Sequence, residues 1–433
     1  MIWSILVSII FFAGVALFIA RLVNETGISL PDNRVLSFIT ADKTPNPLGE
    51  KTTSGECVRI FLFALAFRIF IFLLSWIACG IFSNGENIGF IELCSKWNLW
   101  DAPHYIEIAQ NGYSQHVENG QHLFLVFFPL YPMLIRVMAA IVRNYIVAGI
   151  LVSTLCYCGG CVLMYKLVTI DYSKSIARTS VVLLSVSPFS FYFGGIMTES
   201  TFFLVTIATF LAIRQHKWFV AGILGILASL TRSVGVFMVV PAAIEWVTSE
   251  RPLLLIKEKG WKCLIRRFIK LLPIALTPIG TLIYLYINYR VEGDPFVFMK
   301  YQSEHWSVNL QFFGKTLRML FSRAFNPTDN WALQSSIFIP GLLSATIAAI
   351  AILLSARRMR SMYISFMIVY FMFNAAHSWP ISMPRYMLCI FPAFWLTASL
   401  TNKHKQIELL IAVAGAVCLG IYLTGYITVH QIM

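Results

Sequence analysis

The feature that most constrains this chain is its series of long, uninterrupted apolar segments. A membrane-crossing helix needs about 20 predominantly apolar residues, and residues 58–82 provide such a segment. The chain of 433 residues is 58% hydrophobic and 12% charged, whereas soluble domains carry about 25% charged residues. A transmembrane barrel would show alternating runs of about ten residues instead. The sequence therefore predicts an all-α polytopic membrane protein.

The basic residues indicate which loops face the cytoplasm. The formal net charge is +13, and lysines and arginines gather in short clusters between apolar segments, as in cytoplasmic loops. No basic patch is combined with aromatic residues in a soluble domain, so we expect no nucleic-acid partner. The clusters are Lys174 and Arg178, Arg214 and Lys217, seven bases within the loop 250–270, Arg357, Arg358 and Arg360, and Lys403 and Lys405.

The polar segment 83–123 has the opposite charge. Its only base is Lys96, and its acids are Glu86, Glu92, Asp101, Glu107 and Glu118. The positive-inside rule excludes this segment from the cytoplasm, so in the endoplasmic reticulum it would be a luminal loop. The same alternation places residues 198–200, the loop 291–335 and residues 377–385 on the luminal side. Because ionisable groups at a membrane are costly, their convergence there would indicate a functional site.

The remaining apolar segments complete a bundle of roughly 11–12 transmembrane helices. The loops before and after residues 218–247 both carry basic clusters and would both be cytoplasmic, so this segment has to cross the membrane twice, with a turn at Arg232. The alternative is one long tilted helix with Arg232 buried and paired. By the same argument the proline-rich piece 127–132 does not cross and is juxtamembrane or re-entrant. The other expected spans are about 146–168, 179–197, 200–213, 271–290, 336–356, 362–378, 385–400 and 407–428.

The first 57 residues are set apart from a membrane catalytic domain at 58–433. Residues 1–20 are apolar, but no basic residue precedes them, so they match a signal peptide poorly. We expect an extra span or an extension of the fold there. Residues 21–57 are polar, with Pro31, Pro45 and Pro47, which predicts a loose linker.

The string from Trp97 to Tyr105 is the most informative polar motif. It sets Asp101 among Trp100, His104 and Tyr105. Aromatic faces stack on sugars, and a carboxylate can take the hydroxyl proton in glycosyl transfer. Asp101 can equally be an N-cap, because Pro103 follows in what would be the first helical turn. The two interpretations are compatible.

Three further motifs offer groups for the same site. Glu199 is either a second carboxylate near Asp101, in which case either acid could be the base, or an acid favoured by the dipole at a helix start. Arg385 is either a phosphate-binding cation or an interfacial anchor. The set Glu304, His305 and Trp306 repeats the combination of acid, histidine and tryptophan, or is a solvated loop.

Motifs for nucleotides, nucleophilic serine and metals are missing from the sequence. It has no P-loop, no dinucleotide-binding glycines, no G-x-S-x-G and no paired metal carboxylates. The nine cysteines are scattered, and Cys156, Cys158 and Cys161 lie in an apolar segment, as small buried hydrophobes do. We therefore expect no metal and no cofactor, and an activated sugar that comes from a lipid.

In chain order these motifs resemble the PIG-V family, GPI mannosyltransferase 2. The resemblance covers roughly residues 58 to 400, and its most specific part is the block around Asp101. The matching strings are Trp100 to Tyr105, Ile108-Ala109, Gly112-Tyr113, Phe127 to Pro129, Ser187-Pro188 with Thr198 to Ser200, Leu230 to Gly235, Gln302 to Trp306, and Pro384 to Tyr386. Residues 1–57 depart from the family pattern.

The resemblance implies a GT-C-type helical bundle and an inverting mannosyltransferase of the endoplasmic reticulum membrane with a luminal active site. Dolichol-phosphate-mannose would supply the second mannose of the glycosylphosphatidylinositol (GPI) core in α-1,6 linkage, with no metal and with a small accessory membrane subunit as a plausible partner. Asp101 would be the general base. Arg385 or Arg232 would stabilise the leaving phosphate, with Trp100, His104, Tyr105, Glu304, His305, Trp306 and Tyr386 as substrate-binding candidates.

Three alternatives stay open. Another dolichol-phosphate-sugar-dependent transferase of the same fold would use Asp101 in the same way. A polytopic lipid or sugar transporter would bury its ionisable groups near the midplane and often show internal repeats, and neither feature is evident here. A non-catalytic subunit would not need the carboxylate of Asp101.

Overall fold

The computed structural model describes residues 2–28, 49–82, 88–326, 330–430 and 432. Within these residues the chain is almost entirely helical, without a β-strand. The α-helices are α1 (Ile2–Glu25), α3 (Ser54–Phe82), α4 (Phe90–Lys96), α5 (Ala102–Asn111), α6 (Leu130–Val142), α7 (Tyr145–Asp171), α8 (Lys174–Ser185), α9 (Glu199–Arg214), α10 (Trp218–Thr231), α11 (Val239–Glu250), α12 (Pro252–Leu271), α13 (Pro278–Glu292), α14 (Val297–Trp306), α15 (Phe313–Ala324), α16 (Trp331–Leu333), α17 (Ile339–Ser355), α18 (Ser361–Ala375), α19 (Met383–Leu388), α20 (Pro392–Thr401) and α21 (Lys405–Ile427). Shorter helical turns are η1 (Leu123–Val126), η2 (Ser190–Phe193), η3 (Ser233–Met238), η4 (Leu272–Leu276) and η5 (Gln334–Phe338).

The predicted class, an all-α polytopic membrane protein, is confirmed. Seven helical stretches in the described residues are long and apolar enough to cross a membrane, and three shorter apolar helices accompany them. The seven are Ile2–Glu25, Ser54–Phe82, Tyr145–Asp171, Ser233–Glu250, Pro252–Glu292, Trp331–Ser355 and Lys405–Ile427, and the shorter ones are Leu130–Val142, Trp218–Thr231 and Ser361–Ala375.

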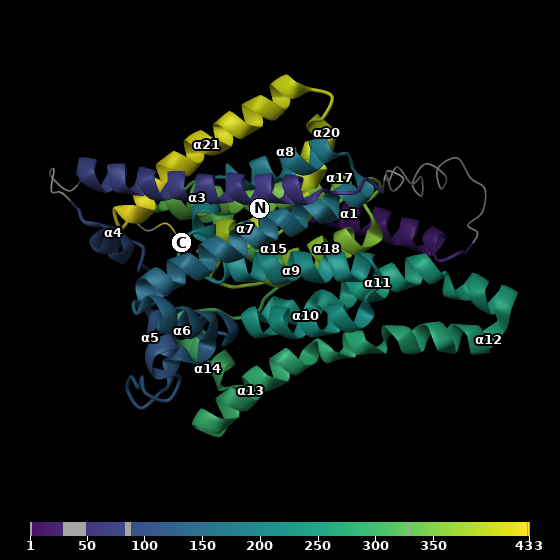
Figure 1. Cartoon of the computed structure of the whole chain (residues 1–433), viewed down its shortest axis with the longest axis horizontal. Helices are drawn as coiled ribbons and strands as arrows, with labels where there is room; N and C mark the ends of the chain where they lie inside the picture. Colours follow the sequence, from purple (N-terminus) through teal and green to yellow (C-terminus); the bar gives the residue numbers. More distant parts are fainter. Residues whose placement is uncertain (1, 29–48, 83–87, 327–329, 431, 433) are drawn as a thin grey trace.

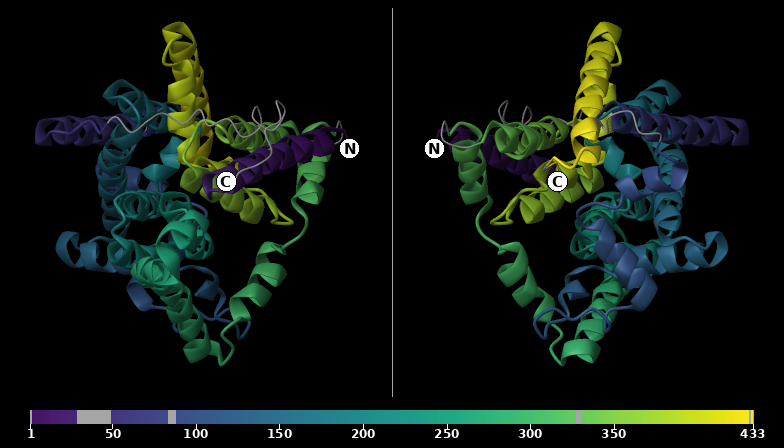
Figure 2. Two further views of the ribbon diagram at one scale, coloured as in Figure 1. Left: turned by 90° about the vertical axis from the view of Figure 1, so that its right-hand side faces the viewer. Right: turned by 90° about the vertical axis from the view of Figure 1, so that its left-hand side faces the viewer.

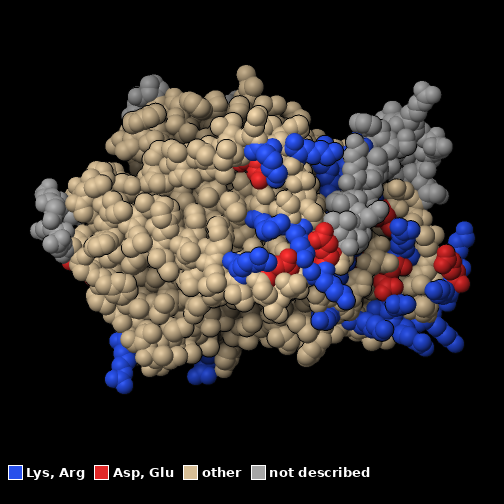
Figure 3. Space-filling view, turned by 45° about the horizontal axis from the view of Figure 1, so that its top comes forward, with Lys and Arg blue, Asp and Glu red and all other residues tan. Residues whose placement is uncertain are grey.

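The two ends of the bundle differ in composition. Helices α4, α5, α6 and α14 gather at the left-hand end in Figure 1, and the turn between α11 and α12 lies at the right-hand end. Most of the Lys and Arg residues visible in Figure 3 lie toward that right-hand end. The end views in Figure 2 show α21 projecting from the rest of the bundle. The acid-rich segment and the basic clusters therefore lie at opposite ends, as the positive-inside rule requires.

The N-terminal helix α1 belongs to the packed bundle. It packs against α15, α17 and α18, and a Cβ on Gly14 would lie 2.9 Å from the Cα of Leu353, so α1 and α17 are in close contact. The helix continues to Glu25, which pairs with Arg21 at 2.6 Å. The predicted linker at 21–57 therefore starts later than expected; its residues 29–48, with all three prolines, lie outside the described residues.

The predicted turn at Arg232 is confirmed, and the alternative of one long helix is wrong. α10 ends at Thr231, and Arg232 is extended with φ −153° and ψ 150°. The following η3 folds back against α10. At the far end of this hairpin, His216 Nε2 lies 3.6 Å from Glu245 Oε1. Residues 218–250 therefore form a hairpin whose two ends lie on the same side, as two crossings between cytoplasmic loops require.

The proline-rich piece leads into a short apolar helix. α6 has 13 residues and begins directly after Pro129. It buries Tyr131 and Ile135 and exposes Val137 and Ile141. With 13 residues this helix is shorter than the about 20 residues of a full crossing, which agrees with the prediction that the proline-rich piece does not cross.

Three predicted boundaries were wrong. The expected span 179–197 stops at Ser185, because the proline at 188 lacks an N–H and disfavours helix in the residue before it. The expected span 385–400 is divided into α19 and α20, and Pro392 starts the second. The expected basic loop 250–270 is the helix α12, kinked at Gly260 with φ 76°.

Substituting Gly235 with alanine should destabilise the hairpin formed by α10 and η3. A Cβ there would lie 2.0 Å from the carbonyl oxygen of Ala228, where backbone has to move. Overpacking of this kind costs about 1–3 kcal/mol. The matched control is Gly80→Ala, because a Cβ on Gly80 meets nothing within 4 Å. We expect a lower melting temperature for Gly235→Ala alone; equal melting of the two variants would contradict the close packing.

Candidate active site

Asp101 stands at the N-cap position of α5, but its side chain does not cap the helix. The helix starts at Ala102, has proline in its first turn and receives no side-chain cap hydrogen bond from Asp101. The preceding residue, Trp100, is left-handed with φ 59°. The carboxylate of Asp101 instead accepts a hydrogen bond from Arg385 Nη1 at 2.7 Å. The capping interpretation thus describes the position of Asp101 and not the contact of its side chain.

Arg385 joins two carboxylates that are far apart in the sequence. Its Nη1 lies 2.7 Å from Asp101 Oδ2, and its Nε lies 2.5 Å from Glu199 Oε1. The same oxygen of Glu199 lies 2.7 Å from Arg232 Nη1. These four residues come from the start of α5, the start of α9, the hairpin turn and α19. We call them the charged quartet.

Burial separates the members of the charged quartet. The side chain of Glu199 is 0% exposed and that of Arg385 is 6% exposed, whereas that of Asp101 is 30% exposed. Removing charges from water is expensive unless they are paired, and the quartet contains two cations and two anions. The N-terminus of α9 adds a favourable dipole for Glu199. The interpretation of Glu199 as only a dipole-favoured acid is therefore insufficient, because it binds both arginines.

Aromatic rings surround the two arginines. The guanidinium carbon of Arg385 lies 5.5 Å from the ring centroid of Tyr192. That of Arg232 lies 5.2 Å from the ring of Tyr386 and 5.8 Å from that of Phe202. Each ring face is attractive to a cation at this distance, so Arg385 and Arg232 are held from several sides. Arg385 is thus buried and bound, and it does not snorkel as an interfacial anchor would.

Next to Asp101 lies a cluster of rings that the sequence predicted in part. His104 stacks on Phe124 at 4.9 Å and meets the edges of Phe127 at 5.0 Å and Trp306 at 6.4 Å. Tyr105 is buried and meets Phe127 at 5.1 Å. Burial lowers the pKa of His104, so its ring is neutral at pH 7. Trp306 therefore joins the predicted site, carried there by α14.

Two buried polar atoms near Asp101 lack a hydrogen-bond partner among the described residues. They are Nε1 of Trp100 and Nδ1 of His104. Buried polar atoms are nearly always paired in folded proteins, so these two atoms call for a partner that the described residues do not supply. Glu199 Oε2 also lacks a partner among the described residues, but the side chain of Glu199 is fully buried.

Two predicted site residues lie elsewhere. Glu304 and His305 are exposed and bond to Gln121, at 3.4 Å and 2.7 Å. They fasten α14 to the polar segment 83–123 and do not reach the charged quartet.

His377 packs against Tyr386 at 5.7 Å. Burial and the nearby Arg232 lower the pKa of His377 to about 4, so it is uncharged at neutral pH.

Several residues of the site had no usable signal in the sequence. Tyr192 lies in an aromatic run, and nothing in that run indicates that it would pack against Arg385.

Glu292 provides a second attachment of α14, besides the bonds of Glu304 and His305 to Gln121. Its Oε1 accepts hydrogen bonds from the backbone N of His122 at 2.9 Å and from Tyr301 Oη at 2.6 Å. Tyr192 and Arg385, and likewise His122 and Glu292, are far apart in the sequence, so only the fold reveals these contacts.

One comparison with known proteins supports a glycosyltransferase. Residues 128–284 match the family model described as dolichyl-phosphate-mannose-protein mannosyltransferase. This segment contains Glu199 and Arg232, and it ends before Arg385. The match confirms the predicted enzyme class, a glycosyltransferase, and agrees with the predicted GT-C-type bundle. It favours a dolichol-phosphate-linked donor and leaves the acceptor open.

A second comparison gives a weaker likeness. The structure titled archaeal oligosaccharyltransferase AglB from Archaeoglobus fulgidus, in complex with an inhibitory peptide and a dolichol-phosphate, is 12% identical with a TM-score of 0.38. The comparison covers 84% of this chain and 56% of that chain, so this chain spans little more than half of its length. A TM-score this low assigns no residue. A comparison with curated protein sequences finds no match.

Glu199→Gln should destabilise the protein much more than Asp101→Asn. Glu199 is fully buried between two arginines, and breaking a buried ion pair costs about 3–5 kcal/mol. Asp101 is partly exposed and makes one such contact, so its loss should cost about 1 kcal/mol. Thermal melting in detergent measures the order, with the exposed Glu118→Gln as control. If Glu199→Gln melts like the control, the buried quartet is wrong.

Proposed function

We propose that this protein is an α-1,6-mannosyltransferase that adds the second mannose to the GPI precursor, with dolichol-phosphate-mannose as donor. The observation that carries the proposal is Arg385, which contacts both Asp101 and Glu199. A carboxylate beside clustered arginines suits a reaction in which a hydroxyl loses its proton while a phosphate leaves. The order of motifs that resembles GPI mannosyltransferase 2 supports this choice of acceptor.

Asp101 is the better candidate for the general base. Its side chain is 30% exposed, and among the described residues its Oδ1 has no hydrogen-bond partner. Glu199 is fully buried, and one of its oxygens is shared by two arginines. An acceptor hydroxyl can therefore approach Asp101 and not Glu199. In this account Glu199 is a positioning residue that holds Arg385 and Arg232 in place.

The bond changes follow from this assignment. The acceptor hydroxyl oxygen attacks the anomeric carbon of the mannose, and its proton passes to Asp101. The bond between that carbon and the phosphate oxygen breaks, and dolichol phosphate leaves with the bonding electrons. Attack opposite the leaving group inverts the configuration, so a β-linked donor gives an α-linked product.

The two arginines have nitrogen atoms available for the leaving phosphate. Arg232 bonds through Nη1, and Arg385 through Nε and Nη1. Within the described chain, Nε and Nη2 of Arg232 and Nη2 of Arg385 make no hydrogen bond. Charge-assisted bonds from guanidinium to phosphate are strong and directional, so these groups would stabilise the charge that develops on the phosphate. The reaction written this way requires no metal and no cofactor.

The setting of the reaction is part of the proposal. A lipid-linked donor requires a site that a membrane lipid can reach, and the acid-rich end of the bundle would face the lumen of the endoplasmic reticulum. A small accessory membrane subunit is a further proposed partner.

One observation favours a second candidate function. The family model matched by residues 128–284 is described by a protein acceptor. A transferase that moves mannose from the same donor to a protein would use Asp101 and the arginines in the same way. Incubating the purified protein with labelled dolichol-phosphate-mannose and either a one-mannose GPI precursor or a serine-rich peptide distinguishes the two acceptors.

Asp101→Asn should abolish function in cells that lack their second GPI mannosyltransferase. The amide keeps the shape of the side chain and loses the proton-accepting carboxylate. We expect the normal chain to restore surface GPI-anchored proteins, and the variant to be made at normal levels while a one-mannose precursor accumulates. General bases contribute about 10²–10⁴-fold to a rate, so residual transfer should be at the limit of detection.

The control for this experiment is Glu118→Gln, which changes an exposed carboxylate of the same polar segment and should rescue fully. Rescue by Asp101→Asn would contradict its role as the base. Failure of the normal chain to rescue would contradict the proposed acceptor.

A further inference from the structure

The helical stretch that contains α12, η4 and α13 is too long for a single membrane crossing. It runs from Pro252 to Glu292 and has 41 residues, whereas a crossing needs about 20. Residues 271–289 carry no charged side chain, and they supply a crossing by themselves. α12 precedes them and lies toward the right-hand end in Figure 1, where the basic clusters gather. It therefore leaves the membrane at that end of the bundle.

The second half of α12 carries two adjacent rows of exposed side chains. Gly260, with φ 76°, separates this half from the first, and the second half buries only Leu271. Residues four apart lie on the same face of an α-helix. The basic row and the apolar row each have three exposed members at this spacing. They are Lys262, Arg266 and Lys270, and Trp261, Ile265 and Ile269.

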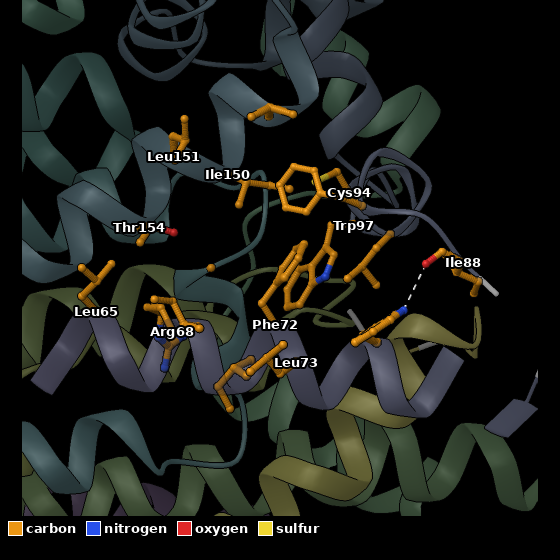
Figure 4. Close-up of a pocket in the computed structure, with 17 residues that line it drawn as sticks. Leu65, Arg68, Phe72, Leu73, Ile88, Cys94, Trp97, Ile150, Leu151 and Thr154 are labelled. Carbon is orange, nitrogen blue, oxygen red and sulfur yellow. Dashed lines mark hydrogen bonds between the residues drawn. The ribbon is translucent and has the colours of Figure 1, made fainter. Parts of the chain in front are cut away.

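A helix that faces only hydrocarbon has a different surface. On the membrane-spanning helix α3, the exposed residues Ile69, Leu73 and Trp76 are apolar and line a cavity of about 560 Å³ with residues of α4 and α7 (Figure 4). The base Arg68 of the same helix is only 4% exposed. On α12, by contrast, exposed bases stand beside exposed apolar side chains. Its surface therefore suits the boundary between hydrocarbon and water.

The basic row has no acidic partner in the part of the chain that the structure describes. None of its three members makes an ion pair there, whereas the neighbouring Arg267 pairs with Glu250 at 3.4 Å. Like charges four residues apart on one helix face repel each other. The basic row is therefore stabilised only when anions from outside the chain approach it.

The depth of the two rows selects the membrane surface as the source of these anions. Lys270 directly precedes the uncharged crossing, and Arg266 lies about 5.4 Å, one helical turn, farther out. The polar layer on each side of a bilayer is about 5–8 Å thick, so both bases lie at the level of the lipid phosphates. Ile269 is at the same depth and meets the lipid chains. A soluble acidic protein would have to displace lipid from the apolar row.

We propose that the second half of α12 binds anionic phospholipids, with the basic row on their phosphate groups and the apolar row against their acyl chains. Helices that combine lysines and arginines with exposed aromatic and aliphatic side chains bind anionic membrane surfaces. The anionic lipids of the cytoplasmic leaflet are the source of these head groups. This contact lies at the opposite end of the bundle from the charged quartet, so it is independent of the reaction and of its acceptor.

The test uses the full chain in nanodiscs made of equal amounts of phosphatidylcholine and phosphatidylserine. The photoreactive residue p-benzoylphenylalanine replaces Ile269, and mass spectrometry identifies the lipid that is attached on irradiation. One base near an anionic surface contributes about fivefold to binding, or about 1 kcal/mol. We therefore expect phosphatidylserine adducts to exceed phosphatidylcholine adducts at least about fivefold. Salt at about 1 M, where the Debye length is about 3 Å, should weaken this preference.

Charge variants test the basic row itself. Combining Lys262→Gln, Arg266→Gln and Lys270→Gln should bring the ratio of the two adducts to about one. Exchanging the bases, as Lys262→Arg, Arg266→Lys and Lys270→Arg, should keep the preference because the charge is unchanged. The matched control removes the same charge from exposed residues of α14 and α15 and should also keep it. Its changes are Lys300→Gln, Lys315→Gln and Arg318→Gln.

Three outcomes would overturn the proposal. One is equal labelling of the two lipids by the chain with its native bases, and another is a preference that neither salt nor the three glutamines reduce. The third is an adduct with a protein and not with lipid when the same chain is irradiated in whole membranes, which would assign this surface to a protein partner. The salt series uses the native bases, so the test does not depend on the folding of a charge variant.

Discussion

The arrangement of the proposed active site depends on the buried pairing of Arg385 with two acids. Arg385 lies on the short helix α19, whereas Asp101 directly precedes α5 and Glu199 is the first residue of α9. A guanidinium can bind two carboxylates at once through separate N–H groups, which a lysine ammonium does less well because it lacks a planar fork. The pairing fixes the relative positions of three segments at the acid-rich end of the bundle. It also leaves Asp101 partly exposed while Glu199 is sealed.

Buried ion pairs at the opposite end complete the same design. Helix α9 starts at Glu199 in the charged quartet and ends at Arg214, which pairs with Asp171 of α7 at 2.8 Å. Arg360 at the start of α18 pairs with the buried Glu245 of α11 at 2.7 Å. Charged groups therefore hold both ends of the central helices, while apolar packing fills the space between them. Such pairs cost desolvation, so their net contribution to stability is small, whereas loss of one partner leaves an uncompensated buried charge.

The sequence predicted the membrane class and the meeting of polar segments better than the individual contacts of the site. Hydropathy and charge alternation predicted the helical membrane class, the turn at Arg232 and the convergence of four polar stretches, because these follow from simple rules of membrane insertion. Residues brought together by long-range packing were harder. Tyr192 carries no signal of its contact with Arg385, and Glu304 and His305 matched a motif but fasten a loop instead. The breaks at Ser185 and before Pro392 were missed because hydropathy alone does not register proline.

The most direct measurement is an experimental structure of the full chain with a non-hydrolysable polyprenyl-phosphate sugar bound. The account predicts the phosphate within hydrogen-bond distance, about 2.7–3.0 Å, of the guanidinium groups of Arg385 and Arg232. Asp101 should face the anomeric carbon from the side opposite the phosphate, with room for a hydroxyl group between them. A phosphate bound away from both arginines, or an anomeric carbon that Asp101 cannot approach, would contradict the central claim.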